Sequence, residues 1–202
     1  VSANLSEADL TKNRKPHIPL PMHPGEFLRE LSFRIGPTME RKSWFMELKT
    51  REEERDAEIQ EMGSEKLEHV NPIRFFEKLE AKMDDDSVIV VDGGDFVATG
   101  AYILRPRKPL SWLDPGVFGT LGVGGGFALG AALVRPDSEV WLIWGDGSSA
   151  YSLAEFDTCV RHGLAPIAVI GTDAAWAQIA REQVVILESD VATTLRFTEY
   201  HK

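Results

Sequence analysis

Three short apolar runs of this sequence each end in a loop rich in glycine or aspartate. The runs are residues 88–91, 140–144 and 167–170, and their length and composition are typical of buried parallel strands. In an open α/β sheet, ligands bind beyond the carboxyl ends of such strands. The loops that would lie there are Asp92-Gly93-Gly94-Asp95, Gly145-Asp146-Gly147-Ser148 and Thr172-Asp173-Ala174-Ala175-Trp176.

Asp146 and Asp173 follow two strands that are joined by a single crossover. If these strands are neighbours, the two loops face each other and the carboxylates can share one hard cation. Magnesium takes about six oxygen ligands, usually one or two carboxylates together with phosphate and water. Backbone N–H groups of Gly147 and Ser148 would then contact phosphate oxygens. Either aspartate alone would indicate a turn or a helix cap, but the pair at matching strand ends favours a metal-bridged diphosphate.

The composition argues against general nucleic-acid binding. Of 202 residues, 43% are hydrophobic and 27% charged, and the formal net charge is -10, whereas nucleic-acid binding needs a basic surface. No run approaches the roughly 20 apolar residues of a transmembrane helix. Cys159 is the single cysteine, and we interpret it as a small buried residue rather than a catalytic thiol. A P-loop motif is absent, and Phe127 stands where a dinucleotide-binding motif would have its third glycine.

Local signals indicate how the first part of the chain is organised. Residues 1–21 are predicted to form a polar tether, residues 22–35 a short helix, and residues 38–70 a charged helix exposed to solvent, which is also compatible with a linker. A compact domain is expected to begin at Asn71, a helix N-cap followed by a proline in the first turn.

The second part of the chain alternates strands and helices. Ser152 and Glu155 have capping-box spacing, which predicts a helix that begins at Ser152, adds its positive end to the diphosphate loop and ends before Gly163. Residues 119–134 hold so many glycines that their backbone is expected to lie close to another helix or to a ligand. The order predicts an α/β fold, a doubly wound parallel sheet with helices on both faces. Residues 184–202 contain no clear final strand, so the fold is expected to be truncated at the C-terminus.

The loop sequences resemble those of thiamine-diphosphate enzymes. Gly145-Asp146-Gly147-Ser148 and Thr172-Asp173, with a spacer of 24 residues at 148–171, resemble that family's Gly-Asp-Gly … Asn-Asn diphosphate motif. Residues 118–124 are similar to its Gly-Thr-Met-Gly stretch. The resemblance covers about residues 71–202, and more loosely 22–70. It is closest to the branch of 2-hydroxyacyl-CoA lyases and acetolactate synthase-like proteins, through residues 90–96, 112–116, 155–157 and 181–183.

The resemblance implies roles for individual residues. Asp146 and Asp173 would be side-chain metal ligands, and the backbone carbonyl of Ala175 would complete the metal site. Leu121 occupies the place of the bulky residue that supports the bent cofactor. Thr172 and Ala175 depart from the family's asparagine and glycine. The implied cofactor-binding set is Asp95, Phe96, Gly119, Leu121, Gly145, Asp146, Gly147, Ser148, Ser149, Asp173 and Trp176.

The resemblance also implies a domain plan in which this chain lacks a catalytic residue of its own. Residues 1–70 would be the end of a middle domain with a charged linker, and residues 71–202 an incomplete diphosphate-binding domain. The glutamate that activates the cofactor is expected in a separate N-terminal domain. We hypothesise that residues 176–183 lie near the substrate end of the cofactor; the alternative is a surface helix. The residues concerned are Trp176, Gln178, Arg181 and Glu182.

The expected activity is thiamine-diphosphate- and Mg²⁺-dependent cleavage of a 2-hydroxyacyl-CoA into an aldehyde and formyl-CoA. The alternatives are an acetolactate synthase-type enzyme acting on 2-oxo acids, and a non-catalytic cofactor-binding or regulatory module. The resemblance further implies a homodimer or homotetramer at the endoplasmic reticulum membrane, with the mitochondrion as the alternative compartment. Membrane contact is expected only through a segment outside this sequence.

Overall fold

A computed structural model describes residues 1–35 and 41–200 of the chain. The chain divides into two compact units, Val1–Glu54 and Arg55–Lys202. The division falls within helix α3 (Lys42–Ser64), so the last turns of that helix belong to the second unit. No helix in the described part of the chain is both long and apolar enough to cross a membrane.

The first unit has more structure than a tether. Strand β1 (Ser2–Ala3) pairs in parallel with β2 (Pro19–Leu20), and α1 (Glu7–Thr11) lies between them in the chain. Ser6 caps α1 by accepting a hydrogen bond from the Asp9 amide, and Leu10 is buried. The prediction of a polar tether over residues 1–21 was therefore wrong, because one buried leucine and one helix cap order the segment. The predicted short helix is confirmed as α2 (Pro24–Ile35).

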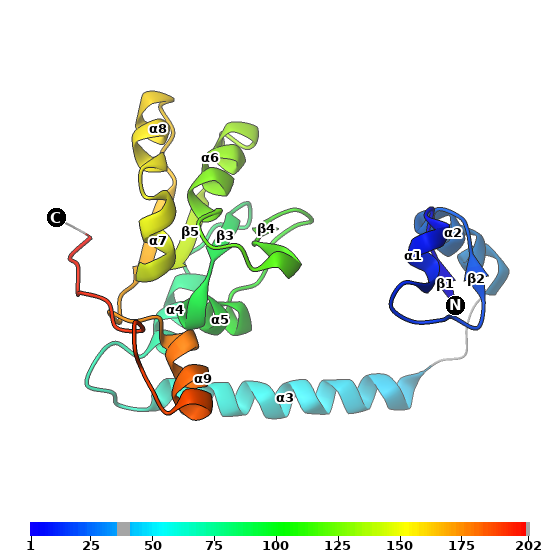
Figure 1. Cartoon of the computed structure of the whole chain (residues 1–202), viewed down its shortest axis with the longest axis horizontal. Helices are drawn as coiled ribbons and strands as arrows, with labels where there is room; N and C mark the ends of the chain where they lie inside the picture. The colour runs from blue at the N-terminus through cyan, green and yellow to red at the C-terminus, as the bar shows by residue number, and fades with distance from the viewer. Residues whose placement is uncertain (36–40, 201–202) are drawn as a thin grey trace. The chain divides into compact units, whose positions relative to one another are not determined.

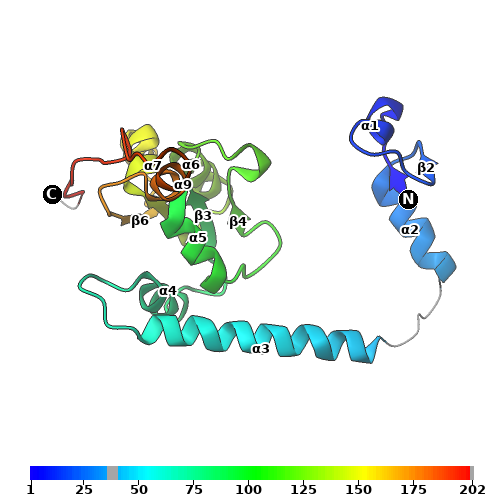
Figure 2. The same cartoon turned by 60° about the horizontal axis from the view of Figure 1, so that its bottom comes forward.

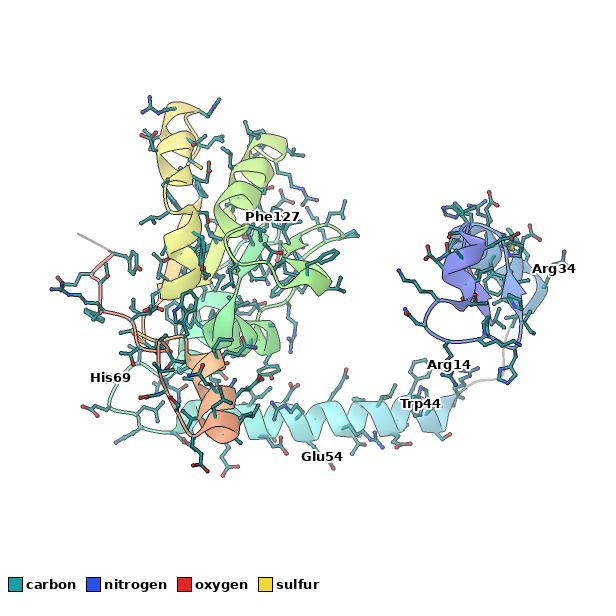
Figure 3. The ribbon with its side chains drawn as sticks, viewed as in Figure 1. Arg14, Arg34, Trp44, Glu54, His69 and Phe127 are labelled. Carbon is teal, nitrogen blue, oxygen red and sulfur yellow. The ribbon has the colours of Figure 1, made fainter. Side chains whose placement is uncertain are left out.

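The charged segment forms the long helix α3, as predicted, but the helix ends at Ser64 and residues 65–70, which were predicted to continue it, form a loop. Residues 38–40 of the predicted helix lie outside the described residues. Its side chains are exposed apart from Ile59 and Gly63, and Trp44 and Glu54 extend away from the helix axis in Figure 3. Ion pairs at i,i+4 spacing, such as Arg51–Glu47 at 2.6 Å, run along its surface. Such pairs support an isolated helix by a few tenths of a kcal/mol each.

The second unit contains a four-stranded parallel sheet in the order β4-β3-β5-β6. Chain order reverses between β3 and β5, which makes their carboxyl ends the switch point where ligands of such sheets bind. The register pairs Asp92 with Trp144 and Gly145 with Gly171, so three strands end at one level. The strands are β3 (Val88–Asp92), β4 (Trp112–Leu113), β5 (Val140–Gly145) and β6 (Ile167–Gly171).

Alternating side chains of β3 build two cores, one on each face of the sheet. Val88 and Val90 pack with α6 (Gly124–Val134), whereas Ile89 and Val91 pack with α4 (Pro72–Glu80). Figure 1 shows α6 on one side of β3 and β5, with α4 and α5 (Gly94–Ile103) on the other. The predicted doubly wound α/β fold is thus confirmed.

Strand β6 departs from its prediction as a buried strand. Ile167 is 38% exposed, and none of the residues of β6 is fully buried. The reason is topological: among the described strands β6 pairs only with β5, so it forms an edge of the sheet.

Asn71 caps α4 as predicted. Its Oδ1 accepts hydrogen bonds from the amides of Ile73 at 3.0 Å and Arg74 at 3.4 Å. Its Nδ2 donates to the Met62 carbonyl at 2.8 Å, which ties the end of α3 to α4. Figure 2 shows these two elements side by side.

The helix after β5 begins earlier than its predicted start at Ser152. Helix α7 (Asp146–Ser152) follows β5 directly, and α8 (Glu155–Arg161) follows after a short turn. Instead of capping, Ser152 Oγ accepts a hydrogen bond from the Gly125 amide in α6 at 3.1 Å. The positive end of the helix therefore lies at Asp146, at the strand end. The predicted C′ role of Gly163 is confirmed by its φ of +66°.

The glycine-rich segment contains both a close packing contact and open positions. A Cβ at Gly125 would lie 2.6 Å from the Ser152 carbonyl oxygen, whereas a Cβ at Gly126 or Gly130 would meet nothing within 4 Å. The expected approach to another helix is therefore present at Gly125. The remaining elements of the unit are the 3-10 turn Gly116–Phe118 and helix α9 (Ala177–Leu187).

Candidate functional site

A cavity of about 1470 Å³ lies beyond the carboxyl ends of β3, β5 and β6. The structure brings nearly all the predicted site residues to its wall; Ser149 is the exception among them. The predicted residues that line it are Asp95, Phe96, Gly119, Leu121, Gly145, Asp146, Gly147, Ser148, Asp173, Ala175 and Trp176.

Asp146 joins the loops after β5 and β6. It is the first residue of α7 and its side chain is almost completely buried. Its Oδ1 accepts a hydrogen bond from the Gly147 amide and its Oδ2 accepts one from the Ala174 amide, both at 2.9 Å. Its carbonyl oxygen accepts a hydrogen bond from the Tyr200 hydroxyl at 3.2 Å. The position of this carboxylate is thus set by two segments far apart in the sequence.

Asp173 lies on the facing loop, where it is exposed and has the carboxylates of Asp146 and Asp95 as neighbours. Its Oδ1 accepts a hydrogen bond from the Ala175 amide at 3.0 Å. Burial raises the pKa of Asp173, and the neighbouring charges of Asp146 and Asp95 raise it further. A carboxylate whose charge is disfavoured by burial and by neighbouring carboxylates is a good setting for a cation. Among the described residues, no group of three or more His, Cys, Asp or Glu side chains is placed to hold a metal ion.

The C-terminal segment holds the Asp173 loop in place. Ala175 forms an antiparallel bridge with Thr194, and the Trp176 amide donates to the Thr193 carbonyl at 2.7 Å. Ala174 has a φ of +56°, an unusual conformation for a residue with a Cβ. Such strain persists where surrounding contacts fix it.

Ser148 and Ser149 of α7 use their hydroxyl groups in hydrogen bonds inside the protein. Ser148 Oγ donates to the Asp92 carbonyl at 2.6 Å and accepts from the Gly145 amide at 3.1 Å. Ser149 Oγ is fully buried and donates to the Asp146 carbonyl at 2.8 Å. Ser149 therefore does not reach the cavity, and a diphosphate contact of the Ser148 hydroxyl would compete with its present hydrogen bonds.

Glycines at the strand ends let large side chains approach the backbone. A Cβ at Gly93 would lie 2.2 Å from Cδ2 of Leu121, and one at Gly171 would lie 2.4 Å from Cγ of Phe96. The Phe96 ring also packs on Phe76, with ring centroids 4.6 Å apart. The wall that carries Leu121 and Phe96 is thus closely packed against the strand ends.

Helix α9 contributes to the rim of the cavity. Trp176 and Gln178 line it, and Arg181 forms an ion pair of 2.6 Å with Asp95 at the start of α5. The structure does not place Glu182 among the lining residues. Whether residues 176–183 lie near a substrate stays a prediction.

Sequence reasoning missed a part of the cavity wall that precedes α4. The loop before α4 contributes Glu68, His69 and Val70, and Figure 3 shows His69 on that loop. Nothing in the local sequence distinguishes these residues from the charged segment that precedes them. Asp92 does not line the cavity, but it is fully buried at the end of β3, and sequence reasoning assigned it no role of its own. An acidic residue that ends a fully apolar strand is a usable signal for such a role.

The comparisons with known proteins agree with this arrangement. Residues 92–201 match the thiamine pyrophosphate enzyme C-terminal TPP binding domain. The 2-hydroxyacyl-CoA lyase 2 of Danio rerio is 47% identical over 206 residues, which cover 100% of this chain and 33% of the relative. Its Homo sapiens counterpart is 51% identical over 160 residues, 79% of this chain and 25% of the relative.

A more distant relative carries a different name. A probable acetolactate synthase of Mycobacterium bovis is 39% identical over 136 residues, which cover 67% of this chain and 25% of that protein. The chain spans about a third, or less, of the length of the curated relatives it matches. The match over residues 92–201 includes more than half of the chain and the whole set of strand-end loops. The chain therefore belongs to the thiamine pyrophosphate enzymes, and residues 92–201 are their C-terminal TPP-binding domain.

Proposed function

We propose that this chain supplies the diphosphate-binding domain of a carbon–carbon lyase that cleaves a 2-hydroxyacyl-CoA into an aldehyde and formyl-CoA. The observation that carries the proposal is the hydrogen bond from the Ala174 amide to Asp146 Oδ2, because it unites the two motif loops at adjacent strand ends. The substrate class is supported by the relatives named 2-hydroxyacyl-CoA lyase 2, which are 47% and 51% identical to it.

The donor groups of the two loops suit magnesium as the metal. Asp146 and Asp173 offer carboxylate oxygens, and Ala175 offers a backbone carbonyl on the same loop as Asp173. These groups leave coordination positions for phosphate and water, which is the usual way in which proteins bind Mg²⁺. Burial is the main cause that raises the pKa of Asp173, and the same ion would relieve the smaller contribution from the neighbouring charges of Asp146 and Asp95.

The remaining residues of the site would bind or orient the cofactor. When bound, thiamine diphosphate supplies the carbon nucleophile and the electron sink. Leu121 would support it from the cavity wall, and Trp176 packs over Gly147, which lies in the first of the two loops that would hold the metal. We assign no catalytic acid or base to this chain, since the activating glutamate is expected in another domain. The chain alone should therefore bind the cofactor without turning over substrate.

Cofactor binding is tested by calorimetric titration of the chain with thiamine diphosphate and Mg²⁺. Asp146→Ala and Asp173→Ala should each weaken binding by about 100-fold, or about 2.7 kcal/mol. Asp157→Ala is the matched control, because it removes an exposed carboxylate of α8 that pairs with Arg161. Circular dichroism checks that each variant is folded. Equal affinity in wild type and in folded Asp146→Ala would refute the metal site.

The activity is tested with a protein that also carries the N-terminal domain. Incubation with a 2-hydroxyacyl-CoA should release an aldehyde and formyl-CoA, and incubation with pyruvate should give no acetolactate. Acetolactate without any aldehyde would favour the synthase alternative, which the 39% identity to a probable acetolactate synthase supports. Cofactor binding without either product would favour a non-catalytic module.

The assembly and the location of the protein are proposals from the family resemblance alone. We propose a homodimer or homotetramer, measured by sedimentation velocity of a protein that carries all domains. We propose the endoplasmic reticulum membrane as the compartment, with the mitochondrion as the alternative. Fractionation of cells that express the tagged protein separates these compartments, and recovery in the cytosol would contradict both.

A further inference from the structure

Asp92 is a buried acidic residue at the end of β3, behind the cavity wall, and it has no cationic partner among the described residues. Its side chain has no exposed surface. Within residues 1–35 and 41–200, no Lys, Arg or His forms an ion pair with it. Burial raises the pKa of Asp92, while hydrogen bonds from the amides of Gly124 and Gly122 oppose that rise. Burial of a charged carboxylate costs free energy unless hydrogen bonds compensate for the lost water. The groups that donate hydrogen bonds to Asp92 therefore indicate what this residue does in the fold.

Those hydrogen bonds connect β3 to the glycine-rich segment. Asp92 Oδ2 accepts from the Gly122 amide at 2.9 Å and from the Gly124 amide at 2.8 Å. Hydrogen bonds to an ionised acceptor are roughly twice as strong as neutral ones. The Asp92 carbonyl accepts from Ser148 Oγ at 2.6 Å, which links the same residue to the first turn of α7.

Leu121 is held between these anchors. It precedes Gly122, which has a φ of +94° and donates its amide hydrogen to Asp92, and it packs where Gly93 lacks a Cβ. A Cβ at Gly124 would also lie 2.8 Å from Cβ of Asp92, so that glycine permits the carboxylate to approach. Asp92 and three glycines thus fix the point at which Leu121 enters the cavity wall.

We propose that Asp92 is a positioning residue, which fixes Leu121 in the cavity wall through the amides of Gly122 and Gly124 and so strengthens the binding of thiamine diphosphate. The proposal rests on the proposed function for its ligand. The anchoring of residues 119–124 by Asp92 does not depend on a ligand and can be tested on the chain without cofactor. Asp92 itself touches neither the cavity nor the proposed metal ligands, and acts through Leu121.

Asp92→Asn tests the anchoring because it keeps the shape of the side chain but loses its charge. Without cofactor, amide hydrogen exchange at Gly122 and Gly124 should become at least about tenfold faster, since both amides donate to one carboxylate oxygen and would lose an ionised acceptor for a weaker neutral one. Exchange in residues 140–144 should not change. Ser148→Ala is the matched control, because it removes the hydrogen bond to the Asp92 carbonyl and leaves the carboxylate intact. Unchanged exchange at Gly122 and Gly124 in Asp92→Asn would overturn the proposal.

A double-variant cycle tests whether Asp92 acts through Leu121. Asp92→Asn and Leu121→Ala should each weaken thiamine diphosphate binding by about tenfold, and the double variant should bind no worse than Leu121→Ala alone. Independent losses that multiply to about 100-fold would overturn the proposed route. If wild type fails to bind the cofactor, the proposed function fails, whereas the exchange experiment still decides the anchoring.

The wild-type chain provides a test if Asp92→Asn does not fold. Amide chemical shifts of Gly122 and Gly124 should both follow one pH midpoint, which lies above the ordinary pKa of an aspartate. Amide chemical shifts of Gly122 and Gly124 that do not change as Asp92 titrates would overturn the proposal. The Gly163 amide, outside this contact, serves as the internal reference.

Discussion

The indole of Trp176 lies directly against Gly147, so that a Cβ at residue 147 would be 2.4 Å from Cζ3 of the ring. Gly147 belongs to the first turn of α7 and Trp176 immediately precedes α9. Tyr151 lies nearby, with its ring centroid 6.4 Å from that of Trp176. The contact therefore joins the loops after β5 and β6, each of which carries one proposed metal ligand.

Gly147→Ala should push these loops apart. The methyl group has no room beside the indole, and overpacking of this kind typically destabilises a protein by about 1–3 kcal/mol. Separation of the loops should also weaken thiamine diphosphate binding by about tenfold. Urea unfolding measures the first effect, calorimetry the second, and a shift of the tryptophan emission reports the displaced ring.

Gly126→Ala is the matched control for that substitution. Its added Cβ would meet nothing within 4 Å, and the residue lies inside α6. Alanine should therefore stabilise the chain by about 0.5–1 kcal/mol through its higher helix propensity. Cofactor affinity should not change. A Gly147→Ala variant as stable as Gly126→Ala would show that Trp176 moves away without cost.

Local sequence signals predicted those features that depend on neighbouring residues. The apolar runs gave β3, β5 and β6, and Asn71 and Gly163 mark the start of α4 and the end of α8. The same reasoning failed where a contact between residues far apart in the sequence determines the local structure. Ser152 has the spacing of a capping box, but its hydroxyl bonds to Gly125, which is 27 residues away.

The candidate site also has features that the sequence predicts and features that it does not. The loops that hold Asp146 and Asp173 were predictable because the motif and the strand ends coincide in sequence. The contacts that stabilise these loops were not predictable from pattern. Tyr200 reaches the Asp146 carbonyl across 54 residues, and Arg181 reaches Asp95 across 86 residues. Such pairs arise from the crossovers of the sheet and have no periodicity that a local reading could detect.

Phe76→Ala should be among the most destabilising substitutions in the second unit. Its ring is fully buried between α4 and the sheet and packs against Phe75 and Phe96. Truncation of a buried phenylalanine typically costs about 3–5 kcal/mol. Phe127→Ala on α6, where the ring is 38% exposed, should cost less than half as much. Denaturant unfolding of both variants gives the comparison, and equal losses would contradict the assigned core.

Arg107 and Glu80 form an ion pair that is less exposed to solvent than the pair Arg161–Asp157 on α8. The pair is 2.6 Å long, and the Arg107 side chain is 11% exposed. Arg107 also donates to the Glu80 carbonyl at 3.1 Å. Arg107→Ala should therefore reduce the free energy of unfolding by about 2–4 kcal/mol, toward the range for buried pairs.

The exposed pair Arg161–Asp157 on α8 is the control for Arg107. Its removal by Arg161→Ala should cost only about 0.3–0.5 kcal/mol, as for other i,i+4 pairs on a helix surface. Both variants are compared by urea unfolding at one ionic strength. A loss for Arg107→Ala no larger than for Arg161→Ala would show that water screens the Arg107–Glu80 pair.

Asp92 and Asp86 should give opposite pH dependences of stability. Burial raises the pKa of Asp92 in the folded chain, so the folded state binds its proton more tightly than the unfolded state. The free energy of unfolding contributed by Asp92 should therefore fall as the pH rises from the unfolded pKa to the folded one, and stay constant above it. Hydrogen bonds from Lys108 and Ser138 lower the pKa of Asp86. Its contribution should be present above the unfolded pKa and be lost as the pH falls through the folded one.

Unfolding of wild type, Asp92→Asn and Asp86→Asn from pH 3 to pH 7 separates these effects. The stability of wild type relative to Asp92→Asn should decrease with rising pH just above the ordinary aspartate pKa, because the variant has no proton to lose there. The stability of wild type relative to Asp86→Asn should increase with pH below that value. Parallel curves for wild type and Asp92→Asn would mean that the Gly122 and Gly124 amides fully offset the burial of the Asp92 charge.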